Sequence, residues 1–204
     1  MVIDLDRCLG CKACAVSCKS ENGVRLGGFR SWVSEKERGQ YPMVTRAFLP
    51  RLCNHCEKPA CQKVCPVGAT YKRADGLIVI DKSKCIGCRY CMVACPYGVR
   101  YFNPRRDSEE ARLFPARTFG TVDKCDFCAH RVDNGVVPAC VNTCIAYART
   151  FGDLNDPESE VYRIHNSERL VPLLPEFGTG PSVFYKGGHP MLFAVSHGTR
   201  KVTI

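Results

Sequence analysis

Cysteine is the residue type whose number and spacing in this chain indicate a chemistry. Sixteen of the 204 residues are cysteine. They form four quartets with none left over: Cys8, Cys11, Cys14 and Cys18; Cys53, Cys56, Cys61 and Cys65; Cys85, Cys88, Cys91 and Cys95; and Cys125, Cys128, Cys140 and Cys144. A 4Fe-4S cluster takes one thiolate per iron, and bacterial ferredoxins supply three of them from a short run. The sequence therefore predicts four 4Fe-4S clusters, with all sixteen cysteines as iron ligands.

The fourth cysteine of a ferredoxin quartet often precedes proline and ligates the other cluster of a pair. Cys65 and Cys95 are each followed by proline, whereas Cys18 and Cys144 are not. We expect the same exchange in both pairs. The expected ligand sets are Cys8, Cys11, Cys14 and Cys144 for cluster 1; Cys125, Cys128, Cys140 and Cys18 for cluster 2; Cys53, Cys56, Cys61 and Cys95 for cluster 3; and Cys85, Cys88, Cys91 and Cys65 for cluster 4.

Other uses of the cysteines fit these spacings less well. A disulfide framework is typical of short secreted domains with a signal peptide, and the opening Met1-Val2-Ile3-Asp4 leads us to expect no such signal. A structural zinc site takes four ligands from two separate pairs, which suits only the fourth quartet taken alone. Unligated cysteines that pack as small hydrophobic residues leave the regular spacing unexplained.

The charge and the missing motifs narrow the function further. The formal net charge is +9, but an oxidised cluster with four thiolates carries roughly −2, so four clusters would bring the protein close to neutral. Basic residues form no dense block, and we expect no nucleic-acid partner. No apolar run is long enough to span a membrane. With no nucleotide-binding motif and no evident catalytic base, we expect a non-catalytic carrier of electrons.

The elements that must position these ligands are short, and the sequence predicts an α+β fold of two interlocked ferredoxin-like units. Residues 53–102 form one unit, with a hairpin turn at Asp75-Gly76 and a short helix after each fourth cysteine. Residues 1–52 and 103–152 form the other, so the first is inserted into its sequence. Residues 153–204 form a C-terminal helix and an irregular, partner-binding tail. Such units have little core, so we expect the iron-free protein to be poorly folded.

The connecting segments have recognisable signals as well. Extended character over 29–33 and 43–49, with a polar turn over 34–39, predicts a hairpin packed over the clusters. The charged segment from Asn103 to Gly120 predicts a surface loop that contacts a partner. Asp156 is expected to cap a helix that ends near Ser167.

Two histidines and three aromatic residues lie among the cluster cysteines in the sequence. His55 and His130 are expected beside the ligands or at the surface, because the cysteines already satisfy every iron. Trp32, Tyr97 and Tyr101 are expected to be packing residues.

Several motifs together resemble the iron-sulfur subunit of the DMSO reductase family of molybdoenzymes. They are the order of the four quartets, the block from Cys53 to Pro66 and the run from Lys84 to Gly98. Segments 123–128, 138–140 and 151–157 are most similar to the polysulfide, thiosulfate and tetrathionate reductase branch, and arsenate reductase small subunits share much of them. The resemblance covers nearly the whole chain. It departs at the loop 103–120 and in lacking proline after Cys144.

The resemblance implies an electron-transfer subunit with its clusters in a line. One partner would be a catalytic subunit with a molybdopterin cofactor, and the other an integral-membrane subunit that reacts with quinone. A sulfur-compound reductase is expected, with an arsenate or DMSO reductase as the alternative. A peripheral position on the periplasmic face, reached by partner-carried export, is expected over the cytoplasmic face. The other function classes are a stand-alone polyferredoxin between soluble enzymes and a zinc-stabilised interaction protein.

Overall fold

A computed structural model describes residues 1–104, 119–188 and 192–193, so most of the loop predicted over 103–120 lies outside the described residues. The described strands are β1 (Val2–Asp4), β2 (Ser31–Gln40), β3 (Met43–Leu52), β4 (Thr70–Lys72), β5 (Ile78–Ile80), β6 (Tyr101–Phe102), β7 (Val122–Asp123), β8 (Arg149–Thr150), β9 (Leu170–Pro172) and β10 (Phe184–Lys186). The described helices are α1 (Ala13–Glu21), α2 (Ala60–Lys63), α3 (Tyr90–Val93), α5 (Ala129–Val132), α6 (Ala139–Asn142), α7 (Glu160–Ser167) and the 3-10 helix η1 (Pro175–Phe177). The mixture of short helices and strands agrees with the predicted α+β class.

The hairpin predicted at Asp75-Gly76 is confirmed. β4 and β5 pair antiparallel, with Thr70 opposite Ile80. Gly76 has a φ of 85°, a left-handed conformation that glycine adopts without steric cost. A second short pair, β6 and β7, joins the segment after the third quartet to the segment before the fourth. Two-residue strands of this kind are held by their surroundings and not by their own ladder.

The short helices carry the third cysteine of a quartet and do not follow the fourth, so that expectation is wrong. α2 contains Cys61 and ends before Cys65, and α3 contains Cys91 and ends before Cys95. The proline after Cys65 and after Cys95 disfavours helical dihedral angles at the residue before it, so the helix has to end earlier. α1 differs, because it contains both Cys14 and Cys18.

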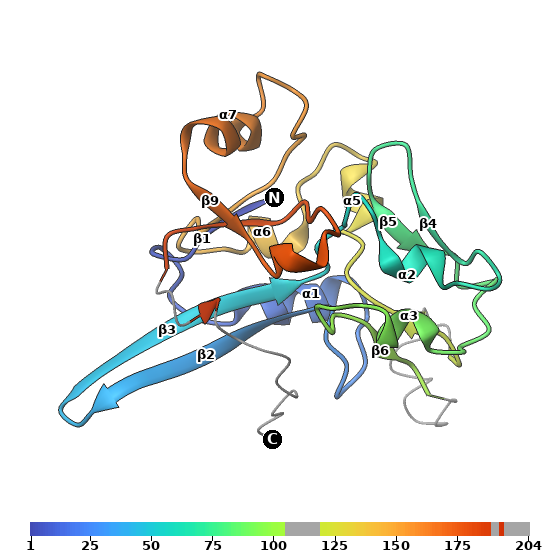
Figure 1. Cartoon of the computed structure of the whole chain (residues 1–204), viewed down its shortest axis with the longest axis horizontal. Coiled ribbons are helices and arrows are strands. Elements are labelled where there is room, and N and C mark those ends of the chain that lie inside the picture. Colours follow the sequence, from blue (N-terminus) through green and yellow to red (C-terminus); the bar gives the residue numbers. More distant parts are fainter. Residues whose placement is uncertain (105–118, 189–191, 194–204) are drawn as a thin grey trace.

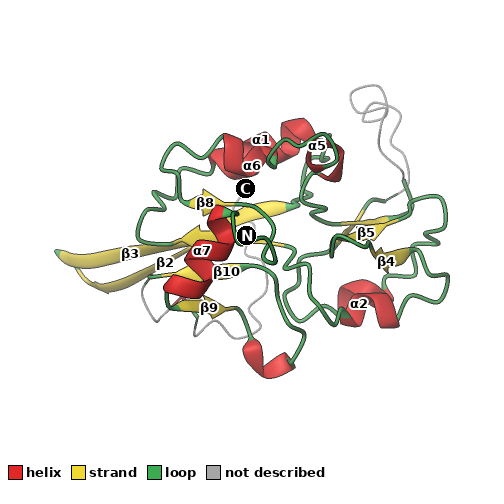
Figure 2. Cartoon of the chain, turned by 90° about the horizontal axis from the view of Figure 1, so that it is seen from above, coloured by secondary structure: helices red, strands yellow, loops and turns green. Residues whose placement is uncertain are grey.

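The largest sheet joins the two ends of the described chain. Its strand order is β8-β1-β10-β9, with β1 parallel to β10 and Ile3 opposite Tyr185. α7 crosses one side of this sheet in Figure 2. The expectation of an irregular tail is therefore wrong for β9 and β10, because both are paired strands of this sheet. Val183 and Tyr185 are also buried, so this part of the tail is packed into the protein. α7 ends at Ser167 as predicted, but it begins at Glu160, and Asp156 instead accepts the backbone N–H of Glu158 at 3.0 Å.

The hairpin predicted between the first two quartets is formed by β2 and β3, which pair from Ser31 and Leu52 to Gln40 and Met43. Its turn lies at Tyr41 and Pro42, so the polar segment 34–39 is part of β2 and not the turn. The near half packs against the first quartet, while the far half projects from the body in Figure 1. At its tip Tyr41 is 93% exposed. Only half of the hairpin covers the predicted cluster sites.

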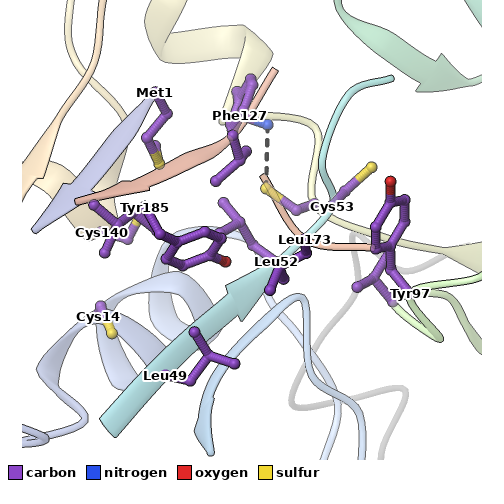
Figure 3. Close-up of a cluster of buried hydrophobic side chains, with 14 of the residues drawn as sticks. Met1, Cys14, Leu49, Leu52, Cys53, Tyr97, Phe127, Cys140, Leu173 and Tyr185 are labelled. Carbon is purple, nitrogen blue, oxygen red and sulfur yellow. Dashed lines mark hydrogen bonds between the residues drawn. The ribbon is translucent and has the colours of Figure 1, made fainter. Parts of the chain in front are cut away.

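Four of the cysteines predicted to bind iron are part of the hydrophobic core. Cys14, Cys53, Cys125 and Cys140 are buried in one cluster of side chains with apolar residues of β1, β3 and β10. Figure 3 shows Met1, Leu52 and Tyr185 lying among the sulfurs of this cluster. The Tyr185 hydroxyl donates to the carbonyl oxygen of Pro50 at 2.8 Å. The core therefore adjoins the sites predicted for clusters 1, 2 and 3.

Candidate metal centres

A hollow opens beside the first quartet. The cysteines on its wall are Cys8, Cys11, Cys14 and Cys144. Val33 of β2 and Pro50 of β3 close one side. The structure thus brings together the four residues predicted for cluster 1, three from the first quartet and one from the fourth.

A second hollow lies beside the third quartet. The cysteines on its wall are Cys85, Cys88, Cys91 and Cys65. These are the residues predicted for cluster 4, again with the fourth member taken from another quartet. Cys88 is exposed, as is Cys11 in the first hollow, so both hollows reach the surface.

The residues predicted for cluster 2 also lie close together. Burial raises the pKa of the Cys18 thiol to about 12, with further contributions from the neighbouring thiols of Cys140 and Cys128. Asn22 of the α1 C-terminus lies 3.8 Å from the Cys18 sulfur and 3.6 Å from the Cys128 sulfur through its Nδ2. Cys125 is near both Cys18 and Cys140. Burial and neighbouring thiolates disfavour the ionised form of a thiol, and a cation among these four cysteines would favour it.

The residues predicted for cluster 3 gather in the same way. Burial raises the pKa of Cys56 to about 11, opposed by a hydrogen bond with Thr179 and reinforced by Cys53, Cys95 and Cys61. Cys95 is likewise near Cys53 and Cys61.

Backbone N–H groups point at several sulfurs. The amide of Ala148 donates to Cys144 Sγ at 3.3 Å, and the amide of Phe127 donates to Cys125 Sγ at 3.4 Å, the latter drawn in Figure 3. For Cys65, burial raises the pKa of the thiol, but hydrogen bonds from backbone amides of residues 67, 69 and 70 lower it more. Such bonds stabilise thiolate over thiol, as an iron ligand requires.

Residues in the left-handed backbone conformation lie at equivalent positions in the first and third cysteine quartets. Gly10 and Gly87 precede the second cysteine with φ of 68° and 70°, and Lys12 and Arg89 follow it with φ of 63° and 67°. A Cβ atom on Gly87 would collide with the carbonyl oxygen of Gly120. Glycine is therefore required at this position for both its dihedral angle and its lack of a side chain.

Gly87→Ala is expected to lose cluster 4, because the alanine must move the backbone that holds Cys88. The iron content should fall from about sixteen to about twelve per chain. Gly135→Ala is the matched control, since Gly135 has a φ of 71° and open space around its Cβ position. The control should keep all its iron and lose only about 1–3 kcal/mol of stability to backbone strain. Equal iron content in the two purified variants would contradict this assignment.

The four ligand sets are neighbours in one order. Cys14 of set 1 is near Cys140 of set 2, and Cys125 of set 2 is near Cys53 of set 3. Cys61 of set 3 is near Cys91 of set 4. The sites therefore follow one another as 1, 2, 3 and 4, and the exposed Cys11 and Cys88 belong to the two end sites.

The donor set suits a cluster better than a single ion. In the part of the chain that the structure describes, no three His, Cys, Asp or Glu side chains converge closely enough to hold one metal ion. A zinc ion needs four ligands at about 2–2.3 Å from one point. A 4Fe-4S cluster spreads its four thiolates over four irons, which fits cysteines arranged around a hollow.

The histidines lie where the sequence predicted, beside the ligands or at the surface. His55 is buried, its Nδ1 accepts the backbone N–H of Ile78 at 3.0 Å, and its ring stacks on Phe127 at 3.8 Å. Burial holds the pKa of His55 well below its usual value, so the ring is neutral. His130 is exposed and lies 2.7 Å from the Glu21 carboxylate.

The predicted packing residues are largely enclosed. Tyr97 and Tyr101 are buried, and Trp32 is partly buried against the hydrophobic core. The hydroxyl of Tyr97 is 2.6 Å from Thr179 Oγ1. The Tyr101 hydroxyl donates to Asp123 at 2.9 Å.

Sequence reasoning missed three buried cations near the ligands: Arg100, Lys124 and Arg149. The Lys124 ammonium donates to the carbonyl oxygen of Cys125 at 2.7 Å, and Arg149 Nη2 donates to Cys14 Sγ at 3.3 Å. One signal was present in the sequence: each arginine stands five residues after the fourth cysteine of its quartet, Cys95 or Cys144.

In the described ranges, no helix is both long and apolar enough to cross a membrane.

The geometry and the sequence define an iron-sulfur protein of the dicluster class. The pattern of the 4Fe-4S dicluster domain matches residues 44–154, and a second such pattern matches residues 7–69. A tetrathionate reductase subunit of Salmonella typhimurium is 44% identical over 191 residues, covering 92% of this chain and 71% of the relative. A selenate reductase subunit of Mesobacillus selenatarsenatis is 45% identical over 205 residues, covering 91% and 70%. The arsenate respiratory reductase iron-sulfur subunit of Shewanella sp. is 39% identical over 220 residues, covering 91% and 94%.

The chain belongs to this family of 4Fe-4S dicluster iron-sulfur subunits. The resemblance predicted from the cysteine motifs is thereby confirmed. The relatives favour an electron-transfer subunit of an oxidoreductase over a stand-alone polyferredoxin.

Proposed function

We propose that this chain conducts electrons along four 4Fe-4S clusters within a respiratory oxidoreductase of anaerobic metabolism. Each bound cluster supplies a centre that accepts and releases one electron. The chain's own residues provide the thiolates, the amide donors and the enclosing apolar walls. We assign no catalytic step to the chain itself, and the chemistry at the substrate belongs to partner subunits.

The observation that carries this proposal is the composition of the two hollows. Each has three cysteines of one quartet and the last cysteine of another on its wall. We assign all sixteen cysteines to iron in the four ligand sets defined above. The contacts between sets support a linear path with clusters 1 and 4 at its ends.

The same exchange of cysteines makes the two units interlock. We propose that residues 1–52 and 103–152 form one two-cluster unit around the inserted unit 53–102. Residues 153–204 would complete the first unit's sheet through β9 and β10 and contact a partner with their outer side. The pairing of β10 with β1 and with β9 supports the role of this segment in the sheet.

The partners proposed are a molybdopterin catalytic subunit at one end of the path and a quinone-reactive integral-membrane subunit at the other. A sulfur-compound reductase is favoured, with the arsenate and DMSO types as alternatives, and relatives of all three types support this range. We propose a peripheral position on the periplasmic face, reached by export with a partner. Protease treatment of spheroplasts tests the side of the membrane.

Anaerobically purified protein is expected to contain about sixteen irons per chain. It should absorb broadly in the visible range and bleach with dithionite, because reduced clusters absorb less. Affinity purification of the native complex should recover a molybdenum-containing subunit and a membrane subunit. A colourless protein with stoichiometric zinc would overturn the cluster proposal, and recovery of the iron-loaded chain without partners would overturn the complex.

A further inference from the structure

Two buried arginines occupy equivalent places in the two proposed units. Arg149 of β8 is 5% exposed and Arg100, directly before β6, is 2% exposed. Each follows the last cysteine of its quartet by five residues. The repetition of position and burial in both units suggests one shared role.

Each arginine faces sulfurs of two different ligand sets. Arg149 donates to Cys14 of set 1 at 3.3 Å and lies within electrostatic reach of Cys140 of set 2. Arg100 lies within reach of Cys53, Cys61 and Cys95 of set 3 and of Cys91 of set 4, and its Nη1 donates to Thr70 Oγ1 at 3.2 Å. Each guanidinium therefore lies near sulfurs of both ligand sets proposed for its unit.

Each arginine is enclosed with thiols that would ionise as iron ligands. Arg149 is buried against Cys14, with its Nη2 atom 3.3 Å from the sulfur. A buried cation depends on a negative group nearby, and thiolate ligands would supply such groups to Arg149 and Arg100.

Reduction adds one electron, and so one negative charge, to a cluster. A fixed cation nearby lowers the free energy of the reduced state and thereby raises the reduction potential. The effect is large where water is excluded, because the local dielectric constant is low. A cation between two clusters acts on both of them.

We infer that Arg149 and Arg100 set reduction potentials in pairs, Arg149 for clusters 1 and 2 and Arg100 for clusters 3 and 4. They are positioning residues, and neither exchanges electrons itself. The inference rests on the ligand sets proposed above. It divides the electron path into two segments whose driving forces are adjusted separately, one by each arginine.

The test is a redox titration monitored by electron paramagnetic resonance on the isolated complex, with Arg149→Met, Arg100→Met and the double variant. Each single variant should lower the equilibrium constant for reduction at least tenfold, about 59 mV for one electron, for two of the four clusters. The two variants should shift different clusters, and the double variant should shift all four. Arg163→Met is the control, since Arg163 is 63% exposed, and it should shift none.

Lysine variants separate charge from packing. Arg149→Lys and Arg100→Lys keep the charge, so their potentials should stay closer to the parent values than those of the methionine variants. Equal shifts in the lysine and methionine variants, or shifts of the same two clusters by both arginines, would overturn the inference. Unchanged potentials in a fully loaded methionine variant would do the same.

Iron content keeps the possible failures distinct. If the parent complex lacks four clusters, the ligand sets are wrong and the inference goes with them. If the parent is loaded but a methionine variant is not, Arg149→Gln and Arg100→Gln replace it, because glutamine keeps a hydrogen-bond donor without charge. Iron loss in both neutral variants with full loading in the lysine variants would show that the charge is needed to hold a cluster, and it would overturn the assignment of these arginines to the potentials alone. Iron loss in all three variants assigns a packing role and overturns the inference.

Discussion

Removal of the iron is expected to unfold the protein. Oxidative destruction of the clusters followed by chelation, with thiols kept reduced, should abolish the native circular dichroism spectrum and the cooperative thermal transition. This loss corresponds to the whole free energy of unfolding, about 5–15 kcal/mol for an ordinary domain. Dithionite reduction without chelation is the control, since it changes the charge but keeps the iron, and the spectrum should then persist.

The physical reason lies in the lengths of the elements and the composition of the core. α2, α3, α5 and α6 have four residues each, far below the ~12–15 residues at which isolated helices become marginally stable. Four of the cysteines proposed as ligands are also core residues. Without clusters, their thiols would line hollows instead of anchoring the chain. An iron-free protein with an intact, cooperative transition would show that packing alone specifies the fold.

The second large effect concerns the exchange of fourth cysteines. Cys18→Ser is expected to damage cluster 2, whose other ligands come from the distant fourth quartet, and to spare cluster 1, to which the rest of its own quartet belongs. The reason is the position of Cys18. Its thiol is buried near the thiols of Cys140 and Cys128, and burial and both neighbours raise its pKa. One cluster, about four of the sixteen irons, should be lost or altered.

Variants of other cysteines identify which cluster is affected. The comparison works even if no paramagnetic resonance signal has yet been assigned to a particular cluster. The paramagnetic resonance spectrum of Cys18→Ser should lose the same signal as that of Cys128→Ser, and a different one from Cys11→Ser. The inserted unit offers a parallel comparison, in which Cys65→Ser should match Cys88→Ser. A match between Cys18→Ser and Cys11→Ser would refute the exchange in the outer unit.

The parts of this protein that the sequence predicts best depend on local signals. The Asp75-Gly76 turn needs only two residues to define it, and α7 ends at Ser167 as expected. The family was evident from the cysteine spacing, since that spacing follows from the geometry of a cluster. The predicted hairpin was also found, although its turn lies at Tyr41 and Pro42 and not in the polar segment before it.

The missed features depend on contacts between distant residues. β1 and β10 have three residues each, too few to produce an alternating pattern, and their paired residues Ile3 and Tyr185 lie near opposite ends of the described chain. The burial of Arg100 and Arg149 was equally hidden, because arginine normally indicates surface and only the folded chain surrounds these two with sulfur. Each of these arginines follows the fourth cysteine of its quartet, Cys95 or Cys144, by five residues. This spacing is visible in the sequence, but the sequence alone does not indicate that the arginines are buried beside the predicted sites.

The parallel pairing of β1 with β10 has a consequence for the timing of biosynthesis. β1 leaves the ribosome about 180 residues before its partner, roughly 10–40 s earlier at ordinary rates of translation. Until then, the edge of β1 that pairs with β10 has no partner strand. The cysteines of the segment 53–102 are all synthesised by residue 95, well before that point. Closure of the largest sheet is therefore a late step for the nascent chain, and it comes after every cysteine has been synthesised.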